Sequence, residues 1–115
     1  MKINFNIDLL PDAQEFLEQI DDKAREKIFY NLKKSQFVVD NELFKKLNSY
    51  KWEFRTLYNN KSYRLFAFWD KTEEQEVLVI ATHGIIKKTQ KTPVKEINKA
   101  EEIRKEYFEI KRNEE

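Results

Sequence analysis

Hydrophobic and polar residues alternate over residues 1–8, and a helical spacing of hydrophobic residues replaces this alternation further along the chain. The alternation is typical of a strand with one buried face. Pro11 then stands where the first turn of a helix tolerates proline, and Asp21-Asp22 interrupts the helical pattern where a second helix can be capped. Because the break between the two helices is short, they are expected to form an antiparallel hairpin. Their hydrophobic positions are Ala13, Phe16, Leu17 and Ile20, then Ala24, Ile28, Phe29 and Leu32.

The second half of the chain contains three further strand-like segments. Residues 52–58 and 63–69 are predicted to pair as a hairpin, because Asn59-Asn60-Lys61 between them suits a tight turn. Residues 77–82 form the third segment. Residues 37–50 are less regular, and their hydrophobic positions indicate a short helical turn that plugs the core.

A last helix is predicted to begin at Thr92-Pro93, and its hydrophobic residues share one face. The order of elements is then β-αα-βββ-α. Because the helices are separate from a run of consecutive strands, the sequence predicts an α+β fold, with a mainly antiparallel sheet of about four strands. The whole chain, residues 1–115, is expected to form a single domain.

The composition argues against several classes of protein. Nine Phe, five Tyr and two Trp in a chain with 37% charged residues indicate a packed interior. With one His and no Cys, the chain has no disulfide framework and no evident set of metal ligands, so neither a metal nor another cofactor is expected. No hydrophobic run approaches the length of a membrane span, and no signal peptide is evident, so we expect a cytoplasmic protein without a membrane partner. A net charge of +1 also argues against general coating of nucleic acid.

Basic residues are nevertheless concentrated in one stretch, residues 82–100, which has five Lys against one Glu. Lys87, Lys88 and Lys91 follow the third predicted strand directly. A lysine-rich loop between a strand and the start of a helix suits a phosphate-rich ligand. The alternative is that these lysines form an ordinary solvated surface.

Two arginines on the predicted hairpin extend this basic surface. If the helical hairpin covers the opposite face of the sheet, Arg55 and Arg64 emerge together on the open face, where they can clamp one phosphate. With the nearby lysines, they would stabilise the extra negative charge of a pentacoordinate transition state. In the alternative interpretation, each Arg pairs with a cross-strand carboxylate such as Glu53. In this form, with Arg64 among the groups around the scissile phosphate, the nuclease hypothesis requires Arg64 to lie near Lys87 and Lys88, outside a buried structural ion pair.

His83 is the one residue with an ordinary pKa near neutrality, which makes it a candidate general acid or base. The alternative is a histidine at the end of a strand that is hydrogen-bonded to the backbone. The neighbouring Gly84 is expected to permit a β-bulge or a tight turn at the end of the strand.

Four stretches of the chain resemble the RelE/HigB-type toxins of toxin–antitoxin systems, and above all the phage-derived, Gp49-like branch. They are Trp52-Glu53-Phe54-Arg55, Tyr63-Arg64-Leu65-Phe66, His83-Gly84-Ile85-Ile86-Lys87-Lys88-Thr89-Gln90-Lys91-Thr92-Pro93 and Glu96-Ile97 together with Ala100. The resemblance is good over residues 50–105 and looser over the helical hairpin. Its most specific part is the stretch that begins at His83.

The resemblance implies a RelE-like fold and a metal-independent endoribonuclease that cleaves mRNA, commonly on the ribosome. In that family, the 2′-hydroxyl attacks the adjacent phosphate and the 5′-oxygen leaves. It also implies a cognate antitoxin, commonly a small helix-turn-helix protein. By position in the motifs, the catalytic candidates are Arg55, Arg64, His83 and Lys87, and the RNA-binding candidates are Arg55, Arg64, Lys88 and Lys91. This chain carries Glu53 where some relatives carry Lys, so a Glu53–His83 acid–base pair is a further hypothesis.

Two other functions remain open at this point. One is a non-catalytic RNA- or ribosome-binding domain of phage origin, which would bind RNA in a salt-sensitive way without cleaving it. The other is a structural phage protein with only protein partners, which would do neither.

Overall fold

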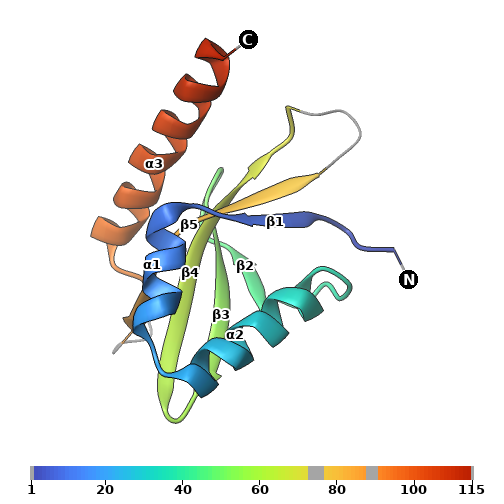
Figure 1. Ribbon diagram of the computed structural model, residues 1–115, viewed down its shortest axis with the longest axis vertical. Coiled ribbons are helices and arrows are strands. Elements are labelled where there is room, and N and C mark those ends of the chain that lie inside the picture. Colours follow the sequence, from blue (N-terminus) through green and yellow to red (C-terminus); the bar gives the residue numbers. More distant parts are fainter. Residues whose placement is uncertain (1, 73–76, 88–90, 115) are drawn as a thin grey trace.

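The computed structural model of the protein describes residues 2–72, 77–87 and 91–114 (Figure 1). Three helices and five strands occur in these ranges, and they confirm the α+β class, the paired N-terminal helices and the C-terminal helix. Their bounds are β1 Asn6–Leu9, α1 Pro11–Gln19, α2 Asp22–Ser35, β2 Phe44–Lys46, β3 Trp52–Tyr58, β4 Lys61–Asp70, β5 Leu78–Lys87 and α3 Val94–Asn113.

The strands form one sheet in the order β1-β5-β4-β3-β2, in which β1 runs parallel to β5 and the other pairs are antiparallel. The sheet therefore has five strands rather than about four. The additional strand is β2, and the prediction of a helical turn within residues 37–50 was wrong at this point. Phe44 lies opposite Phe54 of β3, and the two rings stack with centroids 4.3 Å apart. Burial of this aromatic residue against the sheet favours the extended conformation over a helical turn.

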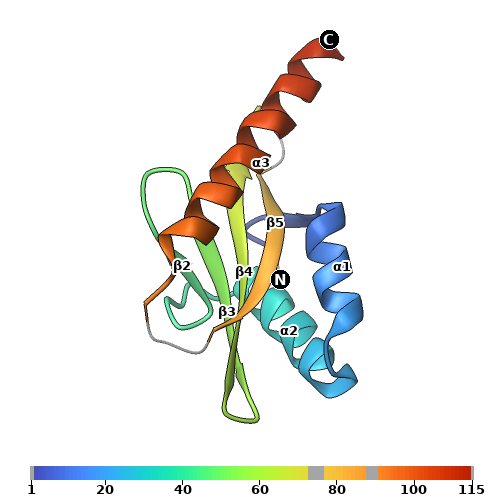
Figure 2. The same ribbon diagram turned by 90° about the vertical axis from the view of Figure 1, so that its left-hand side faces the viewer.

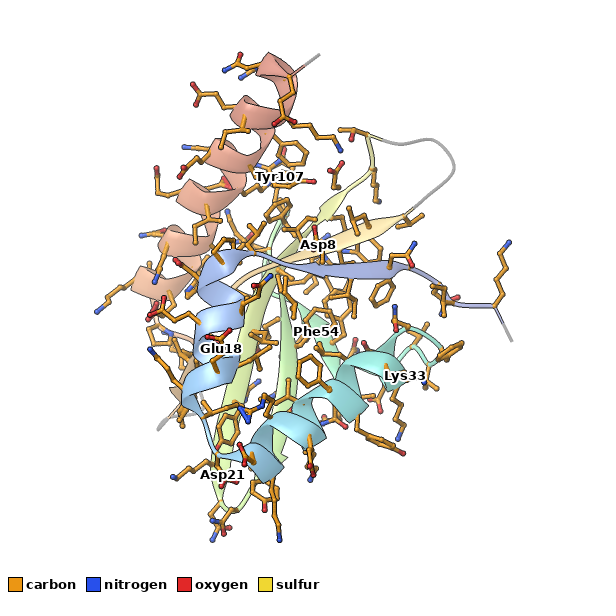
Figure 3. The ribbon with its side chains drawn as sticks, viewed as in Figure 1. Asp8, Glu18, Asp21, Lys33, Phe54 and Tyr107 are labelled. Atoms are coloured by element: carbon orange, nitrogen blue, oxygen red, sulfur yellow. The ribbon has the colours of Figure 1, made fainter. Side chains whose placement is uncertain are left out.

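Helices α1 and α2 cover one face of the sheet, and α3 crosses the other (Figure 2). The main core lies between the helix pair and the sheet, where Figure 3 shows Phe54 pointing toward the helices. The N-terminus of α2 is capped as predicted, because the Asp21 carboxylate accepts a hydrogen bond from the Ala24 amide. None of the helices within the described ranges is long and apolar enough to cross a membrane.

The hairpin between β3 and β4 confirms the predicted turn. Asn59 and Asn60 both have positive φ angles, 51° and 63°, and Tyr58 pairs with Lys61 on either side of them. Asn tolerates this left-handed conformation better than most residues. The turn fixes the register of the two strands, and that register places Arg55 directly opposite Arg64.

Strand β5 is longer than predicted and runs through His83 to Lys87, residues that the sequence placed in a loop. A register shift beside Phe66 leaves Thr82 as an additional residue in β5. Gly84 follows this bulge, and a Cβ atom there would lie 2.3 Å from the Phe16 ring of α1. Gly84 therefore permits the close approach of α1 to the sheet.

Candidate nucleic-acid interface

The face of the sheet opposite α1 and α2 carries a group of charged residues at the end nearer the β3–β4 turn. Glu53 and Arg55 of β3 and Arg64 of β4 have the strand parity opposite to that of the core residue Phe54. Helix α3 packs on β4 and β5 further along the same face (Figure 2). The prediction that Arg55 and Arg64 share the face away from the helix pair is confirmed.

Glu53 lies at the centre of this group and is only 3% exposed. Its Oε2 accepts a hydrogen bond of 3.0 Å from Nη1 of Arg64, which is also buried. Arg64 is held from its other side as well, because its Nε donates to the Ser62 hydroxyl over 2.9 Å. The alternative interpretation of the sequence, in which an arginine pairs with Glu53, is therefore correct for Arg64. The condition that Arg64 stay outside a buried ion pair is not met.

Arg55 is held more loosely and is more accessible. Its Nε lies 3.8 Å from Glu53 Oε2, within ion-pair distance but too far for a hydrogen bond, and its Nη1 donates to the Asn41 carbonyl over 3.4 Å. The side chain is 25% exposed, against 8% for that of Arg64. Of the two arginines, Arg55 is thus the one that a ligand in solvent reaches more easily.

The end of β5 and the residues before α3 complete the group. Nζ of Lys87 donates to the Thr92 hydroxyl over 3.3 Å, and that hydroxyl donates to Glu53 Oε1 over 3.2 Å. Thr92 was predicted to start the last helix, but its side chain does not cap α3 and contacts Glu53 instead. Lys91 is exposed, and Lys88 lies outside the described residues.

We define Glu53, Arg55, Arg64, Lys87 and Thr92 as the Glu53 cluster. Three of its members are cationic and one is anionic, so the cluster has a surplus of positive charge. Burial lowers the pKa of Arg64, and neighbouring Arg55 lowers it further against the opposing effect of Glu53. Burial likewise lowers the pKa of Lys87, with a further contribution from Arg64. Arg55 also contributes to the lowered pKa of Lys87, so both arginines lie within electrostatic reach of this lysine.

Lys45 of β2 adds to the positive charge at the edge of the cluster. It pairs with Glu53 in the register of β2 and β3, so the two residues share a face of the sheet. It is exposed and contributes to the lowered pKa of Lys87. Lys45 was not a candidate residue in the sequence, because the strand that positions it was not predicted.

His83 lies on the same face but apart from the cluster. It is 2% exposed, and the register places Phe66 between His83 and Glu53. The His83 ring stacks on Phe66 with centroids 4.9 Å apart, so the hypothesis of a Glu53–His83 acid–base pair does not fit the structure.

The polar partners of His83 come from β5 and α3. Its Nδ1 lies 2.9 Å from the Thr82 hydroxyl, and its Nε2 lies 3.3 Å from Glu96 Oε1 without hydrogen-bond alignment. Burial lowers the pKa of His83, Lys99 lowers it further, and Glu96 opposes them. The alternative of a hydrogen-bonded strand histidine thus describes the surroundings of His83, although its partner is a side chain rather than the backbone.

A second buried carboxylate, Asp70, lies at the other end of β4 and was not identified from the sequence. It is 1% exposed and accepts hydrogen bonds from the Tyr107 hydroxyl at 2.5 Å, from Lys111 Nζ at 2.7 Å and from the backbone and hydroxyl of Thr72. Tyr107 and Lys111 belong to α3, so Asp70 attaches this helix to the sheet. The spacing of four residues between them was a signal that they share a helix face, but nothing in the pattern connected them to Asp70.

Within the described residues, no group of three or more His, Cys, Asp or Glu side chains is arranged to hold a metal ion. The chemistry that the Glu53 cluster offers is electrostatic: guanidinium and ammonium groups from three strands, arranged around one carboxylate. Such an arrangement suits the phosphate groups of a nucleic acid or another polyanion.

The fold and the cluster together define an α+β protein with a cationic face suited to phosphate. The family described as phage-derived protein Gp49-like (DUF891) matches residues 15–105 of the chain, and the protein belongs to this family. It is a family of RelE-superfamily-like toxins. A comparison with curated protein sequences finds no match.

Proposed function

We propose that the protein is the toxin of a toxin–antitoxin system and acts as an endoribonuclease on mRNA. The observation that carries the proposal is the Glu53 cluster, which gathers Arg55, Arg64 and Lys87 from three strands on a face that α1 and α2 leave open. Membership of a toxin-like family supports the same conclusion.

The burial of Arg64 changes the roles that the sequence suggested for the two arginines. Arg55 becomes the main contact to phosphate, supported by Lys91 and by Lys87 at the cluster. Arg64 lies deeper in the Glu53 cluster than Arg55, so its charge acts on the phosphate over a longer distance. Because Arg64 is buried, water screens its charge less than that of an exposed residue, so the charge still stabilises a developing negative charge.

The proposed reaction needs no metal. The 2′-hydroxyl of one nucleotide loses its proton and attacks the adjacent phosphorus, and the bond to the 5′-oxygen breaks as that oxygen gains a proton. The products are a 2′,3′-cyclic phosphate and a 5′-hydroxyl end. The cations of the cluster stabilise the additional charge on the pentacoordinate phosphorus.

The ribosome and an antitoxin are the partners that this proposal includes. Ribosome-bound mRNA is the proposed substrate, and a small helix-turn-helix protein is the proposed antitoxin, which would cover the cationic face. Both parts of the proposal come from the resemblance of the motifs to RelE/HigB-type toxins and from the family of the chain.

The test is induced expression in a bacterial host, followed by mapping of new 5′ ends on mRNA, and cleavage assays on purified translating ribosomes in the Mg²⁺ that ribosomes require. A separate assay on free RNA with EDTA present tests whether cleavage needs a metal. Arg55→Gln should lower cleavage by about 100-fold, because it removes a charged donor from the transition state. Lys33→Gln is the matched control, since this exposed lysine lies on α2, at the opposite side of the sheet (Figure 3). Unchanged cleavage by Arg55→Gln would contradict the role assigned to Arg55, and absence of new 5′ ends with the wild-type protein would contradict the nuclease.

A non-catalytic RNA- or ribosome-binding domain is the second candidate, and the buried state of His83 favours it. With His83 only 2% exposed beneath α3, the one side chain with an ordinary pKa near neutrality has little access to RNA. This function predicts RNA binding that weakens steeply with salt and depends on Arg55, with no cleavage at any salt concentration.

A further inference from the structure

The two oxygen atoms of the Glu53 carboxylate are occupied by protein groups from different segments of the chain. Oε2 accepts from Arg64 of β4 at 3.0 Å and lies 3.8 Å from Nε of Arg55, and Oε1 accepts from Thr92 at 3.2 Å. Thr92 in turn accepts from Lys87 at 3.3 Å. The carboxylate thereby connects β3, β4, the end of β5 and the segment that leads into α3.

The cations around Glu53 would repel one another without it. Arg55 and Arg64 lie directly opposite in the register, an arrangement that is unfavourable for like charges. Arg55 favours the neutral form of Arg64, and both arginines favour the neutral form of Lys87, whereas Glu53 favours the charged form of Arg64 and of Lys87. A buried anion at this position therefore allows three cations to stay charged and close together before any RNA arrives.

We infer that Glu53 is a positioning residue, which holds Arg55, Arg64 and Lys87 in the arrangement that receives a phosphate of the RNA backbone. Thr92 extends this function to the end of β5, because its hydroxyl lies between Glu53 and Lys87. The inference deepens the proposed function and rests on it. It assigns Glu53 a role in ordering the site, without contact to the reacting atoms.

The geometry distinguishes this role from that of a general base. A base must present a carboxylate oxygen to the 2′-hydroxyl, within hydrogen-bond distance. Glu53 is 3% exposed, and Arg64 and Thr92 already donate to its two oxygens. Substrate would have to displace one of these donors to use Glu53 as a base.

The test compares Glu53→Gln, Glu53→Ala and the control Glu18→Gln, an exposed residue of α1 on the far side of the sheet (Figure 3). A 2′-O-methyl RNA oligonucleotide, which lacks the attacking hydroxyl, serves as the binding probe, and the unmodified RNA serves as the substrate. Simple electrostatics predicts tighter binding when a negative charge is removed from a cationic face. The positioning role predicts the opposite: weaker binding of the probe, and a kcat/KM lower by about 100-fold in Glu53→Ala, as for a misplaced catalytic group. Glu53→Gln keeps one hydrogen-bond acceptor and should lose less.

The pH profile and the fold of the variants separate this role from two others. With the positioning role, the variants keep the pH dependence of kcat found in the wild type. Loss of the acidic limb of the profile in Glu53→Gln would overturn the inference in favour of a general base. Activity and probe affinity that stay at wild-type level, with only the thermal stability lowered, would overturn it in favour of a purely structural role.

Failure of the inference and failure of the proposed function give different results. If the wild-type protein cleaves RNA and Glu53→Ala binds the probe as tightly or more tightly, the nuclease stands and the positioning role is overturned. If the wild-type protein does not cleave RNA, the proposed nuclease function is overturned. Binding of the 2′-O-methyl RNA then tests the role of Glu53 by itself. Weaker binding by Glu53→Ala then supports the ordering of the cations by Glu53, and equal or tighter binding contradicts it.

Discussion

Glu53 and Asp70 are both buried carboxylates on the same face of the sheet, but the groups around them differ in charge and in completeness. Among the described residues, Asp70 has one cation within ion-pair distance, Lys111, and hydrogen bonds from Tyr107 and Thr72. Glu53 has two arginines within 4 Å and Lys87 beyond Thr92. The charge of Asp70 is balanced, whereas Glu53 leaves a surplus of positive charge that a ligand can neutralise.

This difference shows how one kind of residue serves two purposes in a small protein. The Asp70 cluster (Asp70, Thr72, Tyr107 and Lys111) joins α3 to the sheet and has no evident need of a further partner. The Glu53 cluster is close to solvent through Arg55, and its cations are kept together at an electrostatic cost. Surplus like charge of this kind is typical of binding and catalytic sites.

The largest expected effect is that of Arg64→Met, which leaves the Glu53 carboxylate without its closest cation. The free energy of unfolding should fall by about 3–5 kcal/mol, as for other broken buried ion pairs. Urea denaturation at neutral pH measures it. Combining Arg64→Met with Glu53→Gln should recover a large part of the loss, because the second change removes the unpaired charge. A double variant no more stable than Arg64→Met would show that the two residues do not form a mutually dependent pair.

The next effect concerns Asp70→Asn, which should lower the free energy of unfolding by about 2–3 kcal/mol at neutral pH, because it removes the charged partner of Lys111. Burial alone would raise the pKa of Asp70, but the hydrogen bonds from Lys111, Thr72 and Tyr107 outweigh burial and hold the pKa well below its usual range.

The sign of the pH dependence follows from the lowered pKa of Asp70. The unfolded chain takes up the proton near the ordinary pKa of 3.8, before the folded chain does. The stabilisation by Asp70 is therefore complete well above this pH and is lost as the pH falls below it. Denaturation curves at several acidic pH values should show that wild type and Asp70→Asn converge. A constant difference between them down to low pH would contradict the assignment.

The contrast between these two carboxylates also explains what the sequence predicted and what it did not. Local patterns were sufficient for the hairpin at Asn59-Asn60 and for the shared face of Arg55 and Arg64, because a tight turn fixes the register of its two strands. They were not sufficient for β2 or for the partners of Asp70, because these depend on contacts between segments far apart in the chain. The pairing of Arg64 with Glu53 was predicted only as an alternative. The hairpin placed both residues on one face of the sheet, but the carboxylate that Arg64 contacts depends on the packing of the folded protein.

Removal of one hydroxyl donor from each carboxylate gives a smaller and better-matched comparison. Tyr107→Phe removes the donor to Asp70 and should cost about 1.5 kcal/mol of unfolding free energy, since the bond is short and its acceptor is charged. Thr92→Val removes the longer bond to Glu53 and should cost about 0.5–1 kcal/mol, because Arg64 still donates to Glu53. Only Thr92→Val should also weaken binding of the 2′-O-methyl RNA. Weaker binding by Tyr107→Phe instead would mean that the Asp70 cluster contributes to the RNA surface.

The smallest effect tests whether the surplus charge at the Glu53 cluster extends along the chain to Lys91. Lys91 immediately precedes Thr92 and is exposed, so it is placed to contact a second phosphate. Lys91→Gln should reduce the slope of log affinity against log salt concentration by about 0.7, the value for one phosphate contact of a single strand. Lys33→Gln makes the same change of charge on α2 and should leave the slope unchanged. If both variants keep the slope of the wild type, the RNA surface is limited to the cluster. If both variants reduce the slope equally, the affinity depends on the net charge of the protein and not on where the charge lies.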